Sequence, residues 1–154
     1  PKQLVIAGDL FHSADGLSSS IVELFQEWLC KLKLPVILTE GNHDRRSLFA
    51  HYRFPIDVSP LLKLDGLTIT HDPNDLWVGE YGMAGHLHPG IRIKEAPRQS
   101  IKIAGFLVRR SKHLILPAFS EFTGISPLKI GEKDQFFAEI NGTISELPGE
   151  LTQT

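Results

Sequence analysis

Residues 36–44 read VILTEGNHD, a run of strand-forming residues that passes directly into a polar turn. A second run, KQLVIA, occupies residues 2–7 and ends at Gly8-Asp9. Both runs are short, apolar and bounded by turn residues, which is typical of buried strands. Between them, apolar residues recur at helical spacing, namely Ile21, Leu24, Phe25, Trp28, Leu29 and Leu32. The first 44 residues therefore predict strand, helix, strand.

A strand–helix–strand unit of this size predicts two parallel strands with the helix packed against their sheet. The serines at 18–20 offer caps for the start of the helix, and Pro35 ends it. Ligands of open α/β sheets bind beyond the carboxyl ends of the strands. We therefore expect Asp9 and the Asn42-His43-Asp44 turn to lie at one edge of the sheet.

After Pro60, short strand-like runs replace the strand–helix–strand pattern, and this second half of the chain is expected to be antiparallel and β-rich. Asp65-Gly66 and Asn141-Gly142 are hairpin signals between strand-like runs, and residues 45–52 predict a short helix. The expected strands are 61–64, 67–70, 91–93, 100–103, 106–108, 114–116, 136–140 and 143–147. We predict one domain over residues 1–154, α/β at first and α+β in its second half.

The composition is that of an ordinary globular protein, with 22% charged residues and a formal net charge of −2. It shows no basic surplus of the kind that duplex-binding modules carry, although local patches can exist within a neutral total. The single cysteine, Cys30, cannot form an internal disulfide, and we expect it to be buried in the helix. No run of about 20 apolar residues exists to span a membrane. We therefore expect a cytoplasmic protein without a membrane partner.

Five residues that follow apolar runs are candidate metal ligands. Asp9 offers a carboxylate, Asn42 an amide oxygen, and His71, His86 and His88 offer imidazole nitrogens. Mixed oxygen and nitrogen ligands without thiolate favour manganese, iron, zinc or magnesium over a structural zinc site. Two histidines separated by one residue in an extended chain project on the same side.

Glycines precede three of these ligand segments. Gly8, Gly41 and Gly85 each stand where a strand gives way to a polar turn. A glycine at such a place allows a sharp turn or the close approach of another group, because it has no Cβ. We expect a sharp turn or a crowded backbone at these three positions.

Each element is a weak signal when it stands alone, because most single histidines are hydrogen-bonded residues rather than ligands. We interpret His12, His51 and His113 as surface or locally hydrogen-bonded histidines. Phe119 and Phe122 have three readings: core aromatics, which we expect, rings that line a pocket, or platforms on which a base stacks. The arginines at 98, 109 and 110 are interpreted as solvated side chains, with phosphate contact as the alternative.

Together, the elements resemble the calcineurin-like metallophosphoesterases. That family carries Asp-x-His, Gly-Asp-x-x-Asp, Gly-Asn-His-Asp or -Glu, a histidine, and Gly-His-x-His, in this order. Four elements match over about residues 4–90: Gly8-Asp9, Gly41-Asn42-His43-Asp44, His71 and Gly85-His86-Leu87-His88. The resemblance implies a sandwich of mixed β-sheets flanked by helices. It also implies hydrolysis of a phosphomonoester or phosphodiester with two divalent metal ions, manganese foremost.

Further segments are similar to the DNA-ligase-associated members of that family, up to about residue 125. These segments are Gly8–Ser13, Gly85–Gly90, Arg98–Ser100, Leu116–Phe119 and Phe122–Gly124. This narrower resemblance implies a DNA-repair context, a nucleotide or nucleic-acid substrate, and an association with a DNA ligase or helicase.

The chain departs from the family pattern at two places. His12 stands where the wider family often has the second aspartate of Gly-Asp-x-x-Asp, and no Asp-x-His occurs in the 154 residues. In the family, Asp-x-His supplies two ligands to one metal and accompanies the first core strand. We therefore expect a fold that lacks this strand, an exposed sheet edge, and one metal site short of ligands. We also expect the natural chain to extend upstream by several tens of residues.

The resemblance implies a role for each candidate ligand. Asp9 bridges the two ions, and Asn42, His71 and His86 complete one site. His88 belongs to the other site, which is the one short of ligands.

The resemblance also implies a catalytic pair. His43 is the candidate general acid that protonates the leaving oxygen, and Asp44 is expected to orient its ring. The alternative to a phosphoesterase is a non-catalytic scaffold of the same fold that binds a partner, which the missing ligands favour. A third and weaker reading is an α/β binding domain without metal.

Overall fold

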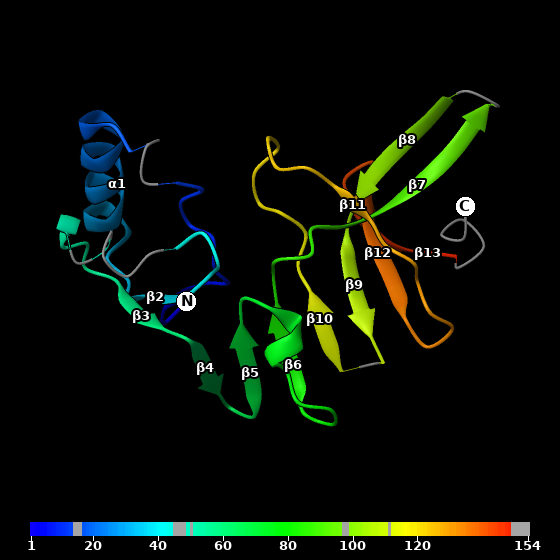
Figure 1. Ribbon diagram of the computed structural model, residues 1–154, viewed down its shortest axis with the longest axis horizontal. Helices are drawn as coiled ribbons and strands as arrows, with labels where there is room; N and C mark the ends of the chain where they lie inside the picture. The colour runs from blue at the N-terminus through cyan, green and yellow to red at the C-terminus, as the bar shows by residue number, and fades with distance from the viewer. Residues whose placement is uncertain (14–16, 45–48, 50, 97–98, 111, 149–154) are drawn as a thin grey trace.

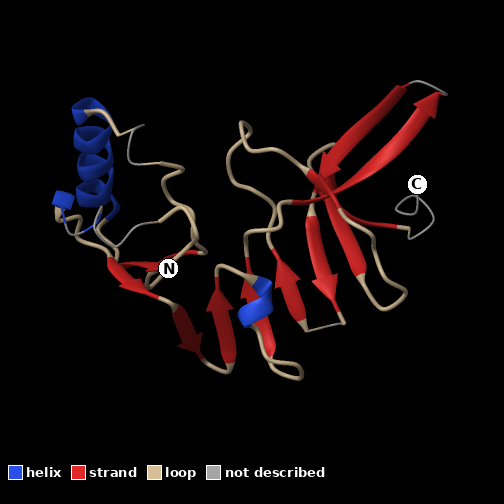
Figure 2. Ribbon diagram, in the orientation of Figure 1, coloured by secondary structure: helices blue, strands red, loops and turns tan. Residues whose placement is uncertain are grey.

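The protein is described by a computed structural model that covers residues 1–13, 17–44, 49, 51–96, 99–110 and 112–148. Within these residues it is a mixed α/β structure with three sheets and one α-helix that is described over its whole length (Figures 1 and 2). In both views the helix and the first sheet lie at the left, and the larger sheet occupies the centre and right. No described helix is long and apolar enough to cross a membrane.

The first sheet is parallel throughout and has the order β1-β2-β3. Its elements are β1 (Leu4–Ile6), α1 (Ser19–Leu32), β2 (Val36–Thr39) and β3 (Asp57–Ser59). Ser18 caps the helix, since its hydroxyl accepts from the Ile21 backbone N–H at 3.4 Å. The chain leaves the helix at Lys33, whose φ is 52°, just before Pro35. The predicted strand–helix–strand unit with parallel strands is confirmed.

The second sheet has seven strands in the order β13-β12-β9-β10-β6-β5-β4, and the third has the order β11-β7-β8. The strands of the second sheet are β4 (Leu61–Leu64), β5 (Leu67–Thr70), β6 (Tyr81–Ala84), β9 (Phe106–Arg109), β10 (His113–Ile115), β12 (Gln135–Ile140) and β13 (Thr143–Leu147). Those of the third are β7 (Pro89–Ala96), β8 (Gln99–Ala104) and β11 (Ser126–Pro127). A short 3-10 helix, η2 (Pro73–Asp75), links β5 to β6.

Both predicted hairpins are present. Asp65 and Gly66, with φ of 49° and 83°, join antiparallel β4 and β5. Asn141 and Gly142, with φ of 51° and 82°, join antiparallel β12 and β13 in the same way. Two successive residues with positive φ are the mark of the tight turn that matches the twist of paired strands.

The expectation of an antiparallel second half is wrong at the centre of the large sheet, where β6 pairs in parallel with both β5 and β10. It is also wrong in the third sheet, where β11 pairs in parallel with β7. Three strands were not predicted: β3, β6 and β11. Residues 81–84 read YGMA, which lacks the β-branched residues that mark a strand. A Cβ on Gly82 in β6 would press on the end of the Leu76 side chain, which would have to move.

Helix α1 buries a narrower face than its periodicity indicates. Val22 and Leu29 are buried, but Leu24 and Trp28 have exposed fractions of 66% and 42%. The expectation that Cys30 is buried is also wrong, because its thiol is on the exposed side of the helix.

The first core cluster lies between α1 and the parallel sheet and is built on aromatic rings. Phe54 has its ring centroid 5.1 Å from that of Phe25, 5.8 Å from Phe11 and 6.2 Å from Phe49. Phe49 is helical, and residues 45–48 and 50 of the helix predicted at 45–52 lie outside the described part of the chain. Because Phe11 follows the turn that carries Asp9, this cluster also anchors that turn.

We predict that Phe54→Ala lowers the free energy of unfolding by about 3–5 kcal/mol, because it removes the ring at the centre of this cluster. Urea denaturation measures the change. The control is Leu24→Ala, at an exposed helix position, which should change stability by less than about 0.5 kcal/mol. Equal losses for the two variants would contradict the assignment of the core.

Candidate metal centre

Four side chains reach one place from the carboxyl ends of four strands. Asp9 follows β1, Asn42 follows β2, His71 follows β5 and His86 follows β6. The two strands of each pair are parallel and therefore end at the same edge of their sheet. The two edges meet at His71, whose Nδ1 lies 2.9 Å from the Ala7 carbonyl oxygen.

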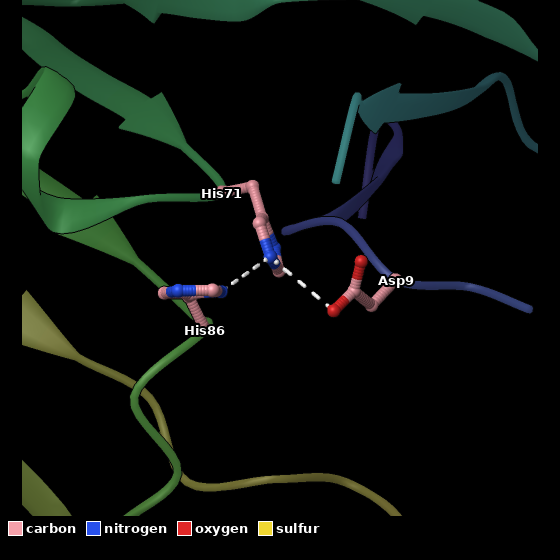
Figure 3. A group of neighbouring side chains, drawn as sticks. All are labelled: Asp9, His71 and His86. Atoms are coloured by element: carbon pink, nitrogen blue, oxygen red, sulfur yellow. Dashed lines mark hydrogen bonds and ion pairs between the residues drawn. The ribbon is translucent and has the colours of Figure 1, made fainter. Parts of the chain in front are cut away.

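Asp9, His71 and His86 form a compact group of potential metal ligands (Figure 3). His71 Nε2 lies 3.3 Å from Asp9 Oδ2 and 3.0 Å from His86 Nδ1. It also lies 3.0 Å from Asn42 Oδ1, so the amide joins the group. His71 is buried, with 6% of its side chain exposed, and Asp9 has 20% exposed. Three different ligand types thus surround one imidazole nitrogen.

The Ala7 contact decides which nitrogen of His71 carries a proton. A carbonyl oxygen can only accept, so Nδ1–H is the donor. In a neutral ring, Nε2 then has a lone pair directed at the oxygens of Asp9 and Asn42, which are acceptors as well. Lone pairs that converge in this way repel one another unless a cation stands among them. A proton on His71 or a metal ion can be that cation, and a proton on His86 Nδ1, 3.0 Å away, can also be donated to the Nε2 lone pair.

The pKa shifts of Asp9 and His71 agree with a positive charge at this place. Burial has the largest single effect on the pKa of Asp9 and raises it. The hydrogen bonds from the His71 ring and the His43 backbone N–H, with the charges of both rings, outweigh burial, so this pKa lies below its usual value. Burial lowers the pKa of His71, but Asp9 and the Ala7 carbonyl reverse the effect, and the net pKa is raised. The group therefore favours positive charge at His71 Nε2.

The spacing of the donor atoms also fits a metal ion. Ligands at right angles, each about 2.1 Å from one ion, lie about 3.0 Å apart. The three donor atoms around His71 Nε2 lie 3.0, 3.0 and 3.3 Å from it. Carboxylate, amide and imidazole together are a donor set for a divalent ion of the manganese, iron, zinc or magnesium kind.

The expected crowding at the glycines is confirmed. A Cβ on Gly8, which has φ of 80°, would overlap the His71 ring, and one on Gly85 would lie 2.8 Å from the Ala7 oxygen. A Cβ on Gly41 would overlap the backbone nitrogen and the carboxylate of Asp9. Each glycine thus lets one ligand loop pass against another.

Asp44 and His43 have partners other than those expected. The buried Asp44 carboxylate accepts from the backbone N–H groups of Leu10 and Gly41, each at 3.0 Å, and it is 3.5 Å from that of Phe11. Burial raises the pKa of Asp44, and these N–H groups offset only part of the effect. Within the described residues, Asp44 clamps the β1 and β2 loops together and makes no hydrogen bond to the His43 ring.

The ring of His43 is oriented by His12 instead. Its Nδ1 lies 3.1 Å from the His12 carbonyl oxygen, and the two rings stack with centroids 4.5 Å apart. His12 thus lies beside the site, which its place three residues after Asp9 could have indicated. The backbone carbonyls of Ala7 and His12 gave no signal in the sequence, because any residue has one.

His88 lies outside the group around His71 Nε2. It lines a cavity of about 300 Å³ together with residues of the loop 118–125. The expectation that Phe119 and Phe122 are core aromatics is wrong, since both are fully exposed. Arg110 is exposed and Arg109 half-buried, and Arg98 lies outside the described residues.

Comparison with known proteins places this geometry in a family. The family model described as calcineurin-like phosphoesterase matches residues 1–107, more than half of the chain, and the chain belongs to that family. Its members typically bind divalent metals. The crystal structure of Pseudomonas putida nuclease MPE superposes with a TM-score of 0.78 and 26% sequence identity, covering 95% of this chain and 70% of that one. No curated protein matches the chain.

We predict that Gly41→Ala weakens the binding of Mn²⁺ at least tenfold, because the new methyl group displaces Asp9. Isothermal titration calorimetry measures the affinity. Gly124→Ala is the control, since a Cβ there meets nothing within 4 Å, and it should bind Mn²⁺ as the wild type does. An unchanged affinity in Gly41→Ala would show that Asp9 is not a ligand.

We predict that Asp44→Asn lowers the free energy of unfolding by roughly 2 kcal/mol or more, because an amide group cannot accept from all of these N–H groups. Urea denaturation of the metal-free protein measures the loss. Asp65→Asn in the β4–β5 turn is the control, because asparagine also tolerates the positive φ found there. A stability equal to the wild type would contradict the role of Asp44 as a clamp.

Proposed function

We propose that this chain is a metal-dependent phosphoesterase that hydrolyses phosphodiester bonds of nucleic acid. The observation that carries the proposal is the convergence of Asp9, Asn42 and His86 on His71 Nε2. These residues lie where two pairs of parallel strands end. Membership of the calcineurin-like phosphoesterases supports the ester chemistry. The likeness to a protein described as a nuclease supports nucleic acid as the substrate.

Divalent metal ions, manganese foremost, would supply a nucleophile at neutral pH and compensate for charge on the phosphoryl oxygens. Asp9, Asn42, His71 and His86 would hold one ion. Asp9 and His88 would contribute to a second, and His88 is two residues from His86 along the chain. The hydrogen bond from His71 to Ala7 fixes the tautomer that a ligand needs, with Nε2 free of a proton.

His43 would act as the proton donor to the leaving oxygen. Because its Nδ1–H is held by the His12 carbonyl, Nε2 is the nitrogen left to carry a transferable proton. The His43 ring is exposed and therefore open to a substrate. The His43 backbone N–H also donates to Asp9 Oδ1 at 2.9 Å, which ties the proton donor to the ligand.

The cellular context belongs to the same proposal. The similarity of Gly85–Gly90 and Leu116–Phe119 to DNA-ligase-associated members supports a DNA-repair context, with a ligase or helicase as partner. We also propose that the protein is cytoplasmic and that residues 1–154 form a single domain.

The test compares two substrates whose leaving groups differ in their need for a proton. With Mn²⁺ added, we predict that His43→Ala lowers kcat about 10²- to 10⁴-fold on a single-stranded oligonucleotide, whose leaving group is an alkoxide. The loss should be much smaller on bis-p-nitrophenyl phosphate, because nitrophenolate leaves without protonation. Asp9→Ala should abolish turnover of both substrates and weaken Mn²⁺ binding.

His51→Ala is the matched control, because His51 is exposed and its ring packs edge-on against that of Tyr52. It should leave both activities unchanged. Equal losses on the two substrates in His43→Ala would remove the proton-donor role. Tight Mn²⁺ binding without turnover of either substrate by the wild type would favour the non-catalytic scaffold.

A further inference from the structure

A turn with exposed apolar side chains joins η2 to β6 at the lower edge of the large sheet in Figure 1. It presents Trp77 and Val78 to solvent, with exposed fractions of 78% and 86%. Tyr81, the first residue of β6, is 59% exposed. These three side chains lie within a short stretch of chain, and their contact with water costs free energy. Exposed apolar side chains that cluster in this way mark an interaction surface.

The turn is held in one conformation by contacts on both sides. The Glu80 N–H donates to the Trp77 carbonyl oxygen, and the Trp77 N–H donates to the Glu80 carboxylate, each at 3.3 Å. Lys112 Nζ donates to the Gly79 carbonyl oxygen at 2.6 Å and lies 5.4 Å from the centre of the Tyr81 ring. A surface that is ordered before binding loses less conformational entropy when a partner arrives.

The residue before the exposed pair anchors the turn to the body of the protein. Leu76 is 7% exposed and belongs to the second core cluster. Its side chain packs over Gly82 in β6. The chain thus directs one apolar side chain inward and the next two outward, so the exposure of Trp77 belongs to a packed segment.

The connection between β9 and β10 supplies positive charge beside this turn. Arg110 and Lys112 are exposed, and Arg109 is half-buried. Among the described residues, none of the three forms an ion pair with a carboxylate. The contact between Lys112 and Gly79 brings this charge to the turn itself.

The nearby carboxylates are engaged by backbone groups rather than by these cations. Glu80 accepts from the Trp77 N–H. Asp134 accepts from the N–H groups of Arg110 at 3.2 Å and Gly131 at 3.1 Å. The cations therefore keep their capacity to pair with carboxylates of another molecule, which favours a partner of opposite charge.

The surface lies at the opposite end of the sheet from the candidate metal centre. His86 follows the carboxyl end of β6, whereas Tyr81 begins that strand. The four residues of β6 span about 13 Å. A molecule bound at Trp77 therefore leaves the metal centre open.

We propose that Trp77, Val78, Tyr81, Arg110 and Lys112 form a docking site, the distal surface, for an acidic peptide segment of a partner protein. An apolar side chain of the segment packs on Trp77 and Val78. Carboxylates on either side of it pair with Arg110 and Lys112. Tryptophan, tyrosine and arginine are the residues that most often carry the binding energy of protein interfaces.

Two other occupants fit the distal surface less well. The phosphates of a nucleic acid strand would meet Glu80 and Asp134 among the cations, and Val78 has no ring on which a base can stack. In a symmetric dimer centred here, the same patch of both copies would meet. Arg110 and Lys112 of one copy would then face the same cations of the other.

This inference goes beyond the proposed function and does not depend on it. Docking at the distal surface requires neither a bound metal nor turnover of an ester. Its test is therefore a binding measurement with metal-free protein, and failure of the enzyme proposal would leave the result unchanged.

The probe is selected from a library of random short peptides displayed on phage, with the full chain as bait in EDTA. We predict that the enriched peptides carry aspartate or glutamate on both sides of an aromatic or aliphatic residue. The most enriched peptide is then synthesised with fluorescein, and its affinity is measured by fluorescence anisotropy. The affinity should fall as salt is added, because the pairing is electrostatic.

We predict that Trp77→Ala and Arg110→Glu each weaken binding of this peptide about tenfold or more. The matched controls are Phe122→Ala, an aromatic that is 101% exposed on another loop, and Lys102→Glu, an exposed cation on β8. Both should bind the peptide as the wild type does. Circular dichroism confirms that each variant is folded.

A glycine pair tests whether the shape of the turn matters. Gly79 and Gly142 both have positive φ, 100° and 82°, and a Cβ on either meets nothing within 4 Å. Alanine therefore strains both backbones without a clash. We predict that Gly79→Ala weakens peptide binding about fivefold or more, whereas Gly142→Ala leaves it unchanged.

Three results would overturn the distal surface. One is a selection that yields no enriched peptide, or peptides without an excess of acidic residues. Another is wild-type affinity for the peptide in both Trp77→Ala and Arg110→Glu. The third is a different occupant: single-stranded DNA that binds in a Trp77-dependent manner and displaces the peptide, or a dimer in sedimentation that Trp77→Ala dissociates.

Discussion

The hydrogen bond from His71 Nδ1 to the Ala7 carbonyl oxygen, at 2.9 Å, is the contact on which the candidate site depends. It joins the end of β5 in the large sheet to the end of β1 in the parallel sheet. It also fixes the ring tautomer, and so leaves the Nε2 lone pair facing Asp9 and Asn42. A buried arrangement of acceptors costs free energy unless a cation occupies its centre.

The surrounding residues hold this unfavourable arrangement in place. Gly8 leaves room for the His71 ring, and Asp44 ties the β1 and β2 loops together through three backbone N–H groups. Behind the loops, the ring of Phe11 packs into the cluster centred on Phe54. Local repulsion at the site is thus offset by packing outside it, which is a common arrangement at functional sites.

Much of the framework could be predicted from the sequence because its signals are local. The turn at Asp65-Gly66 and the strand at 36–39 follow from backbone preferences of the residues themselves. The parallel strand β6 could not, because residues 81–84 have little strand propensity and depend on pairing with β5 and β10. Whether Phe119 is core or surface depends on what packs against it, and a short apolar segment alone does not decide that.

The candidate site also has features that the sequence predicts and features that depend on the fold. The convergence of Asp9, Asn42, His71 and His86 was expected from the family resemblance, which rests on the order of the motifs that carry these residues. The clamp formed by Asp44 and the contact between His43 and the His12 carbonyl could not be foreseen, because both involve backbone groups brought close only by the fold. The sequence identifies which side chains are available, and the backbone decides which partners they meet.

Anomalous diffraction from crystals loaded with Mn²⁺ tests the central claim most directly. A manganese peak within about 2.0–2.3 Å of Asp9, Asn42, His71 and His86 is the predicted result. A strongest peak bound elsewhere, with His71 Nε2 still facing Asp9 and no ion between them, would contradict it.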